Sequence, residues 1–232
     1  YHELGHALVG HYLEHTDDVH KISVISRGQA LGYTISLPRE DRYLTTRTAL
    51  MHQMAMTLGG RAAEEIVFHE VTTGAANDLE KVTSTSKSMI MKLGMSEKLG
   101  PRVLGHSNDQ PFLGRDYSAQ ADYSEEIARE IDDEIRRVIE EAHELALVVL
   151  REHMEQLHQI SQILIERETI DRDQFERLLA GEHESTVFPE PEVAPETPAP
   201  VEEPKRERAP GRPRPFPLPG ATMQPPPDPA KS

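Results

Sequence analysis

The sequence begins with a metal-binding pattern, HELGH, in residues 2–6. On a helix, His2 and His6 lie one turn apart on the same face, so both imidazoles can reach one ion. Glu3 lies about 100 degrees around the helix axis, where its carboxylate can hold a water bound to that ion without being a ligand. Two imidazoles, a third ligand and an open coordination position form a hydrolytic zinc site. The pattern therefore predicts a helix at the start of the chain, zinc bound by His2 and His6, and Glu3 as general base.

A second histidine pair follows in HYLEH, which matches the inverted zinc pattern H-x-x-E-H. At about 100 degrees per residue, His11 and His15 face away from His2 and His6 if the helix is continuous. The two pairs cannot then share one ion, and we favour surface histidines as the explanation of the second pair.

Two histidines do not hold zinc tightly, so a third ligand must come from another part of the chain. The sequence contains no cysteine, which leaves His, Asp or Glu. The candidates are Glu64 and Glu65 in GGRAAEEIV and Asp78 in TTGAANDLEK. Spacing alone does not rank them, and Asp78 has a structural explanation as a favourable charge at a helix N-terminus. The small-residue turn before Asp78 and its short side chain favour it as a rigidly held ligand.

Composition restricts the partners of the chain. A formal net charge of -15 over 232 residues argues against nonspecific nucleic-acid binding, which needs clustered Lys and Arg. No apolar run approaches the roughly 20 residues that cross a bilayer, so we expect membrane attachment only through segments outside this chain. Because the chain starts at a motif, with Tyr1 in place of Met, we expect it to be a fragment of a larger protein.

The hydrophobic pattern predicts a mainly α fold with one small β-hairpin. We expect a helix over 1–15, a hairpin from HKISVIS and LGYTISLP whose apolar positions form the buried face, and a helix over TTRTALMHQMAMTLGG followed by a separate short helix in RAAEEIVF. Apolar residues recur every three or four positions between Ile127 and Val149, which is typical of a packed helix. Helix starts are predicted from the capping-box spacings Asn77/Glu80, Asp122/Glu125 and Asp171/Gln174.

The composition changes near Gly181, and most of the 18 prolines follow it. We expect a folded domain over 1–181 and a disordered tail rich in Pro, Glu and Arg over 182–232, because that segment has too few large apolar residues to offset the entropy of ordering.

Five separated motifs, HELGHALVG, VHKISVISRGQALGYTISLP, LGGRAAEEIVF, VTTGAANDLEK and KLGMSEKLGP, occur in this order. With them, residues 1 to about 180 resemble the proteolytic domain of the FtsH family of membrane-anchored, ATP-dependent zinc metalloproteases. Leu4 departs from the small residue usual at its position. The resemblance implies a mainly helical zinc endopeptidase domain with one Zn²⁺ per chain, in which His2, His6 and Asp78 bind zinc and Glu3 is the catalytic base.

The resemblance also implies partners and a location for the full-length protein. It implies polypeptide substrates that are unfolded or extracted from the membrane, a homo-hexamer, an ATPase ring N-terminal to Tyr1 that alone uses ATP, and a place at the cytoplasmic face of the cell membrane. Proteases commonly bind a substrate as an added strand through backbone hydrogen bonds. We therefore expect substrate to lie along an edge strand made of Leu31, Gly32, Tyr33, Thr34, Ile35, Ser36 and Leu37.

A competing interpretation is a non-catalytic helical module. In it, the helix between Ile127 and Val149 builds an oligomer and the histidines are incidental. Glu3 separates the two interpretations, because an assembly module has no use for a base beside two ligands.

Overall fold

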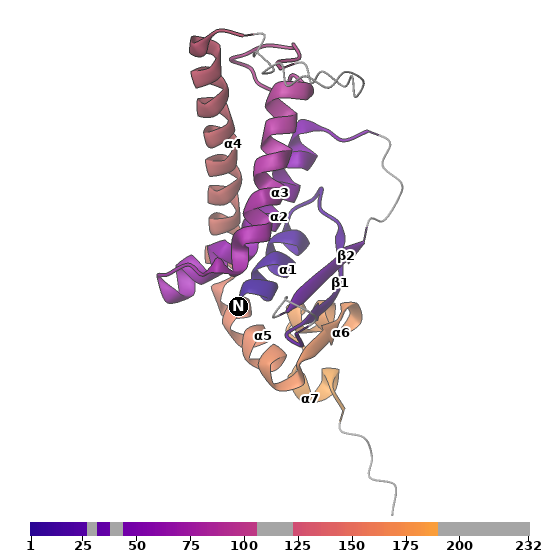
Figure 1. The fold of residues 1–232 in the computed structure, drawn as a ribbon. Helices are drawn as coiled ribbons and strands as arrows, with labels where there is room; N and C mark the ends of the chain where they lie inside the picture. The colour runs from indigo at the N-terminus through magenta and orange to yellow at the C-terminus, as the bar shows by residue number, and fades with distance from the viewer. Residues whose placement is uncertain (27–31, 38–43, 106–122, 190–232) are drawn as a thin grey trace, which may run out of the picture. The chain divides into compact units, whose positions relative to one another are not determined.

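The computed structural model describes residues 1–26, 32–37, 44–105 and 123–189. These residues form a mainly helical structure with a three-stranded antiparallel sheet, which confirms the predicted fold class (Figure 1). The elements are α1 (His2–Tyr12), β1 (Asp18–Ser23), β2 (Tyr33–Leu37), α2 (Arg47–Phe68), a 3-10 helix η1 (Thr73–Ala75), α3 (Ala76–Lys87), a π-helix η2 (Ser88–Lys92), α4 (Glu125–Glu152), α5 (Met154–Arg167), β3 (Thr169–Asp171), α6 (Arg172–Leu179) and α7 (Glu184–Val187).

Helix α1 lies at the centre of the packing and contacts α2, α4, α5 and both strands β1 and β2. Its side chains Leu4 and Leu8 are completely buried, so the larger residue at Leu4 is accommodated inside the core. The helix ends at Tyr12 and not near residue 15 as expected. The reason is local: the hydroxyl of Thr16 donates to the backbone carbonyls of Gly10 and Leu13, which closes the last turn.

Helix α2 is one continuous helix, so the prediction of two separate pieces is wrong. The glycine pair suggested a break, because glycine is unfavourable inside a helix. In the structure, Gly59 of this pair serves packing instead. A Cβ on Gly59 would lie 2.6 Å from the backbone oxygen of Gly5 in α1. Two glycines therefore let the backbones of α1 and α2 touch.

Helix α4 lies beside α2 and α3 (Figure 1). The predicted stripe is confirmed, since Ile131, Val138 and Ala142 are among its buried residues. Ser124 caps the helix by accepting a hydrogen bond from the Ile127 N–H. The predicted cap Asp122 lies outside the described residues.

The sheet has the strand order β2-β1-β3, with both pairings antiparallel. The hairpin of β1 and β2 agrees with the prediction, whereas β3 was not predicted, because three residues carry too little periodicity. Directly after β3, Asp171 and Gln174 form the predicted capping box at the start of α6. The predicted cap Asn77 is wrong: α3 begins at Ala76, continuing from η1, so Asn77 lies inside its first turn.

The buried and the exposed faces of β2 are the reverse of the predicted ones. Ile35 and Leu37 are 38% and 49% exposed, whereas the hydroxyl of Ser36 is buried. The inward face of this strand is polar because it lies against the first turn of α1, where Thr34 contacts Glu3.

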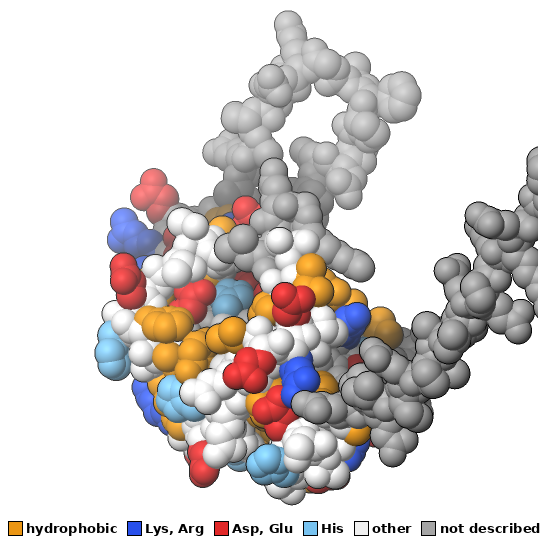
Figure 2. Space-filling model, turned by 90° about the horizontal axis from the view of Figure 1, so that it is seen from below, with side chains coloured by type: hydrophobic (Ala, Val, Ile, Leu, Met, Phe, Trp, Pro, Cys, Tyr) orange, Lys and Arg blue, Asp and Glu red, His pale blue; other side chains and the backbone are white. Residues whose placement is uncertain are grey.

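The ordered structure continues beyond residue 181. Helix α7 falls within the segment 182–232 that was expected to be disordered, and its Val187 is 3% exposed. The remainder of that segment, residues 190–232, lies outside the described residues. No helix among the described residues is both long and apolar enough to cross a bilayer. Figure 2 shows acidic, basic, histidine and apolar side chains interspersed on one face of the molecule.

Candidate metal centre

Helix α1 brings the two histidines of HELGH together. The Nε2 atoms of His2 and His6 lie 3.1 Å apart, and the two rings stand almost perpendicular to each other. Both side chains are partly buried, which removes them from bulk water without sealing them off. The predicted geometry of one helical turn is therefore present.

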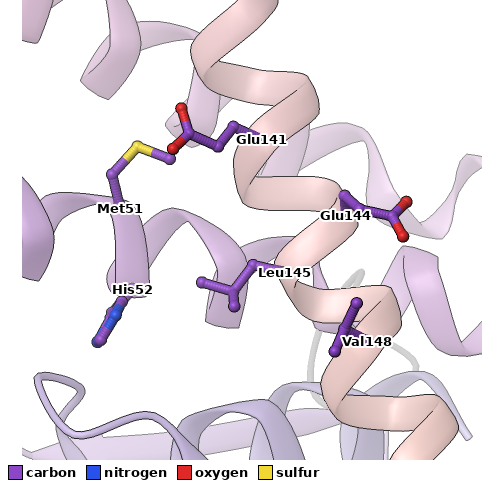
Figure 3. A pocket seen from close by; sticks show the side chains of 6 residues that line it. All are labelled: Met51, His52, Glu141, Glu144, Leu145 and Val148. Atoms are coloured by element: carbon purple, nitrogen blue, oxygen red, sulfur yellow. The ribbon is translucent and has the colours of Figure 1, made fainter.

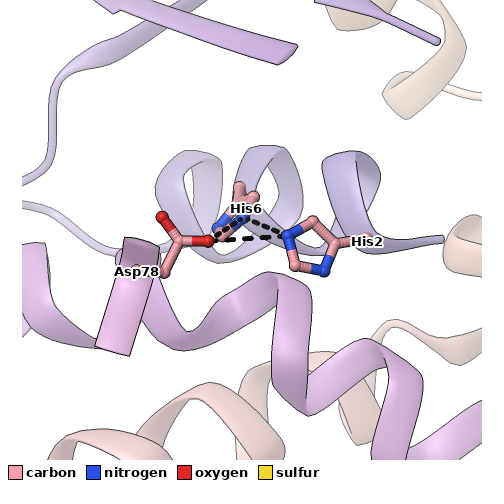
Figure 4. A group of neighbouring side chains, drawn as sticks. All are labelled: His2, His6 and Asp78. Atoms are coloured by element: carbon pink, nitrogen blue, oxygen red, sulfur yellow. Dashed lines mark hydrogen bonds and ion pairs between the residues drawn. The ribbon is translucent and has the colours of Figure 1, made fainter. Parts of the chain in front are cut away.

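Asp78 joins the two histidines from another helix. It lies in the first turn of α3, and its Oδ2 atom is 3.5 Å from Nε2 of His2 and 3.4 Å from Nε2 of His6 (Figure 4). In the described ranges, no other group of three or more His, Asp or Glu side chains gathers its ligand atoms this closely. Of the three third-ligand candidates, Asp78 is the one whose carboxylate reaches both histidines.

The three donor atoms fit a zinc ion. Ligand atoms about 2.0–2.2 Å from a tetrahedral zinc lie roughly 3.3–3.6 Å from one another, close to the observed separations of 3.1, 3.4 and 3.5 Å. Gly60 of α2 leaves room beside them, because a Cβ at this residue would lie 2.5 Å from Nε2 of His6 and 2.6 Å from Nε2 of His2. Two imidazoles and one carboxylate are also a donor set that zinc prefers.

The other ring nitrogen of each histidine is held by an acceptor. Nδ1 of His2 lies 2.9 Å from Oε1 of Glu64, and Nδ1 of His6 lies 2.9 Å from the backbone oxygen of Met56. In the neutral tautomer that binds metal, an Nδ1–H donated to these oxygens leaves the lone pair of each Nε2 directed at the space beside Asp78. Without metal, a proton on Nε2 can be donated to Asp78 instead. The Gly60 N–H also approaches Nδ1 of His6, but at the longer distance of 3.3 Å. Both imidazoles are therefore oriented for binding through Nε2.

The surroundings of Asp78 and Glu64 favour the ionised form of both carboxylates. Burial by itself would raise the pKa of Asp78, but hydrogen bonds from His2 and His6 outweigh burial and hold that pKa well below its usual range. Burial would likewise raise the pKa of Glu64, but the Thr72 backbone N–H and His2 lower it. For His2, burial lowers the pKa, while Asp78 and Glu64 together raise it. The charge on Asp78 suits a ligand of a divalent cation.

Glu3 lies next to the cluster without joining it. Its Oε2 atom accepts a hydrogen bond from Oγ1 of Thr34 at 2.8 Å. The same hydroxyl is 2.9 Å from the backbone oxygen of Glu3. This places the carboxylate between helix α1 and strand β2.

The predicted substrate strand borders this region. Residues 33–37 form β2, which is the edge strand in the described sheet, and Gly32 precedes it. Leu31, the first residue of the predicted set, lies outside the described residues.

The remaining candidates lie elsewhere. Glu65 is 2.9 Å from Nε of Arg61 and 3.0 Å from Nε2 of His143, so it links α2 to α4. Among the described residues, His11 and His15 belong to no group of three possible ligands, and His15 lies beyond the end of α1 at Tyr12.

Figure 3 shows a hollow between α2 and α4. Its lining includes none of His2, His6 and Asp78. The acidic groups on its rim have cationic partners: Glu141 lies 3.0 Å from Arg137, and Glu144 lies 3.2 Å from Arg151. Its lining residues are Met51, His52, Glu141, Glu144, Leu145 and Val148.

Two residues of the site were not singled out from the sequence. Gly60 has a visible signal, the glycine pair within a helical pattern, which often has a packing or functional reason. Thr72 has none, because its contacts with Glu64 depend on how the segment before α3 folds back.

Comparison with known proteins identifies the family. Residues 1–178 match the model of peptidase family M41. The chain is 66% identical over 221 residues to ATP-dependent zinc metalloprotease FtsH 1 of Conexibacter woesei, covering 95% of this chain and 33% of that protein. It is 50% identical over 179 residues to ATP-dependent zinc metalloprotease FtsH of Slackia heliotrinireducens, covering 77% and 23%, and 45% identical over 188 residues to that of Thermotoga maritima, covering 81% and 31%.

The chain thus spans about a third or less of the length of these relatives. The resemblance inferred from five motifs is confirmed, and with it the prediction of a zinc metalloprotease domain. The chain belongs to peptidase family M41.

Proposed function

We propose that this chain is the zinc endopeptidase module of a longer protein, in which His2, His6 and Asp78 bind Zn²⁺ and Glu3 is the general base. The observation that carries the proposal is the convergence of two imidazole nitrogens and one carboxylate oxygen within 4.8 Å of one another. Glu3, the proposed general base, follows His2 directly in helix α1. A structural assembly module has no use for this arrangement.

Zinc at such a site acts as a Lewis acid that lowers the pKa of water and polarises the scissile carbonyl. The task left to the chain is to move a proton. Oε2 of Glu3 is held by Thr34, which leaves Oε1 to take the proton of the attacking water and pass it to the departing amine.

The supports of the ligands give the site its rigidity. Glu64 holds His2, and the Met56 carbonyl holds His6, so neither imidazole has to be ordered when metal binds. Glu64 also accepts from the backbone N–H of Thr72 at 2.9 Å, in the segment that leads to Asp78. A single buried carboxylate therefore supports ligands from both helices.

We propose further that the substrate polypeptide pairs with β2, along Gly32 to Leu37. This strand is the edge of the described sheet and contacts Glu3 through Thr34. Backbone pairing tolerates any side chain, which suits a protease that degrades many sequences. The exposed apolar side chains Ile35 and Leu37 can contact substrate side chains beside the paired backbone.

For the complete protein, we propose degradation of unfolded or membrane-extracted polypeptides by a homo-hexamer at the cytoplasmic face of the cell membrane. Support comes from the resemblance of the five motifs and from the relatives' description as ATP-dependent. ATP would be used by a part of the complete protein that lies outside the region matched by this chain.

The test is metal-dependent cleavage by this chain. The metal-free chain should not hydrolyse unfolded casein, and one equivalent of Zn²⁺ should restore hydrolysis. His6→Ala should abolish both zinc binding and cleavage, whereas His11→Ala, on the same helix but outside the cluster, should retain both. Cleavage by the His6→Ala variant at the wild-type rate would refute the proposal.

A further inference from the structure

The hydroxyl of Thr34 is the polar contact of β2 with the proposed catalytic base. It lies 2.8 Å from Oε2 and 2.9 Å from the backbone oxygen of Glu3. A threonine hydroxyl has one proton, and a carboxylate oxygen is a stronger acceptor than a backbone carbonyl. The side chain thereby connects the strand to the first turn of α1.

Gly32 provides a second, independent sign that β2 is fitted to this carboxylate. A Cβ at Gly32 would lie 2.9 Å from Cγ and 3.0 Å from Oε1 of Glu3, and 2.9 Å from the backbone oxygen of Ser23. The chain thus approaches Glu3 closely at Thr34 in β2 and at Gly32 just before it. One contact holds Oε2, and the other leaves space beside Oε1.

We propose that Thr34 is a positioning residue for the general base: its hydroxyl fixes the rotation of the Glu3 carboxylate so that Oε1 is presented to the water. This inference rests on the proposed function of Glu3. It gives the Thr34 side chain a role distinct from the backbone pairing proposed for the same strand.

The physical reason is the freedom of a glutamate side chain. Glu3 is only partly buried and lies on a helix whose next residue, Leu4, turns into the core, so packing alone does not fix its terminal torsion. That torsion is broad in glutamate. A single donor on Oε2 removes this freedom, because rotation of the carboxylate would break the hydrogen bond.

A consequence is that the strand that receives substrate also aligns the base. Pairing of a peptide with β2 would restrain the residues that hold Glu3. Loss of the hydroxyl should then slow the chemical step more than it weakens substrate binding.

The first experiment compares Thr34→Val with Thr34→Ser in the zinc-loaded chain, using a fluorogenic peptide. Thr34→Val preserves shape and should bind one zinc, keep KM within about twofold and lower kcat by roughly 10- to 100-fold. Thr34→Ser retains the hydroxyl and should recover most of kcat. Thr83→Val is the matched control, because the Thr83 hydroxyl donates to the Leu79 carbonyl of its own helix.

Three kinetic outcomes would overturn the proposal. These are wild-type kcat in Thr34→Val, a Thr34→Ser variant as slow as Thr34→Val, and a rise in KM with kcat unchanged, which would assign the side chain to substrate binding instead. Zinc loss in Thr34→Val would also contradict it, since the hydroxyl contacts no metal-binding atom.

A second experiment does not depend on activity. In the metal-free chain, the unfolding equilibria of Thr34→Val, Glu3→Ala and the double variant form a thermodynamic cycle. The hydrogen bond predicts non-additive effects of at least about threefold in the unfolding constant. Additive effects would show that the contact is absent in solution. If the cycle shows coupling but the wild-type chain cleaves nothing, the proposed function fails and the contact stands.

Discussion

Glu64 and His2 form a hydrogen bond of 2.9 Å that connects α2 to α1. It lies on the side of the His2 ring away from Asp78. Glu64 is 5% exposed and also accepts from the backbone N–H and the hydroxyl of Thr72. The Glu64 carboxylate therefore accepts three hydrogen bonds, and the one from His2 comes from Nδ1, the ring nitrogen away from Asp78. It acts as a support for a ligand, while Asp78 faces both histidines.

The different positions of Glu64 and Asp78 predict the order of zinc affinity among three variants. Asp78→Ala removes a ligand and should lower zinc affinity most. Glu64→Ala removes a support and should lower it by about 10- to 100-fold. Glu65→Ala should leave it unchanged, because Glu65 contacts Arg61 and His143 instead. Chelator competition measures all three, and normal zinc binding by Asp78→Ala would return that residue to the role of a helix-start charge.

Glu3→Gln separates metal binding from chemistry. The amide oxygen can still accept the Thr34 hydrogen bond, but the side chain cannot take a proton. We expect one zinc per chain and a loss of hydrolysis of at least about 100-fold. Metal content and casein cleavage would be measured on the same sample. Wild-type hydrolysis in this variant would exclude Glu3 as the base.

Gly60→Ala should damage the metal site while favouring its own helix. Alanine is about 1 kcal/mol better than glycine inside a helix, yet the added methyl group would collide with Nε2 of His2 and His6. We expect strongly reduced zinc affinity in a protein that still folds. Gly10→Ala is the matched control, because the atoms nearest to its methyl group would be those of the Met56 side chain and not a histidine nitrogen. Circular dichroism reports folding, and equal zinc affinities in the two variants would contradict the prediction.

Glu134, a buried carboxylate on α4, makes the free energy of unfolding depend on pH. Hydrogen bonds from Arg137 hold the pKa of Glu134 below its usual value, burial opposes this, and the Ser96 hydroxyl adds to the lowering. A depressed pKa contributes stability that is fully present above the ordinary carboxyl pKa of about 4.3 and is lost as pH falls through the folded-state pKa.

Accordingly, Glu134→Gln should lower the free energy of unfolding by roughly 1.5–3 kcal/mol at pH 7. The difference in the free energy of unfolding between this variant and the wild type should narrow as the pH falls below about 4.3. Urea denaturation of the metal-free chain between pH 3 and pH 7 measures it. Glu140→Gln, on the exposed side of the same helix, is the control. A difference that stays constant with pH would show that Glu134 has the same pKa in the folded and the unfolded chain, which would contradict the lowered pKa.

Pairing of substrate with β2 predicts a periodic response to methylation of the substrate backbone. N-methylation removes one N–H at a time, and alternate residues of a strand direct their N–H groups to opposite sides. Methylation at every second residue of a peptide should raise KM, while methylation of the residues between should have little effect. A response without this period of two would leave β2 as a structural strand only.

The elements that depend on local pattern were predictable from the sequence. The apolar stripe of α4 and the capping box at Asp171 follow from rules that act over one or two turns. The proximity of His2 and His6 follows from helical geometry alone. These features need no knowledge of the tertiary structure.

Other features depend on residues distant in the sequence and were missed or left open. β3 exists because residues 169–171 meet β1, and the exposed position of Ile35 follows from the contact of Thr34 with Glu3. The choice of Asp78 over Glu64 could not be made from spacing, because both carboxylates reach His2, one on each ring nitrogen.

The contact of Gly5 with Gly59 has a further consequence for the metal centre. Side chains change rotamer on fast timescales, but main chains in direct contact have no such freedom. The separation of α1 and α2 is therefore insensitive to repacking of neighbouring core residues. The histidines on one helix and the oxygen of Met56 on the other move as a single rigid unit, so sequence drift in the surrounding core should leave the coordination geometry unaltered.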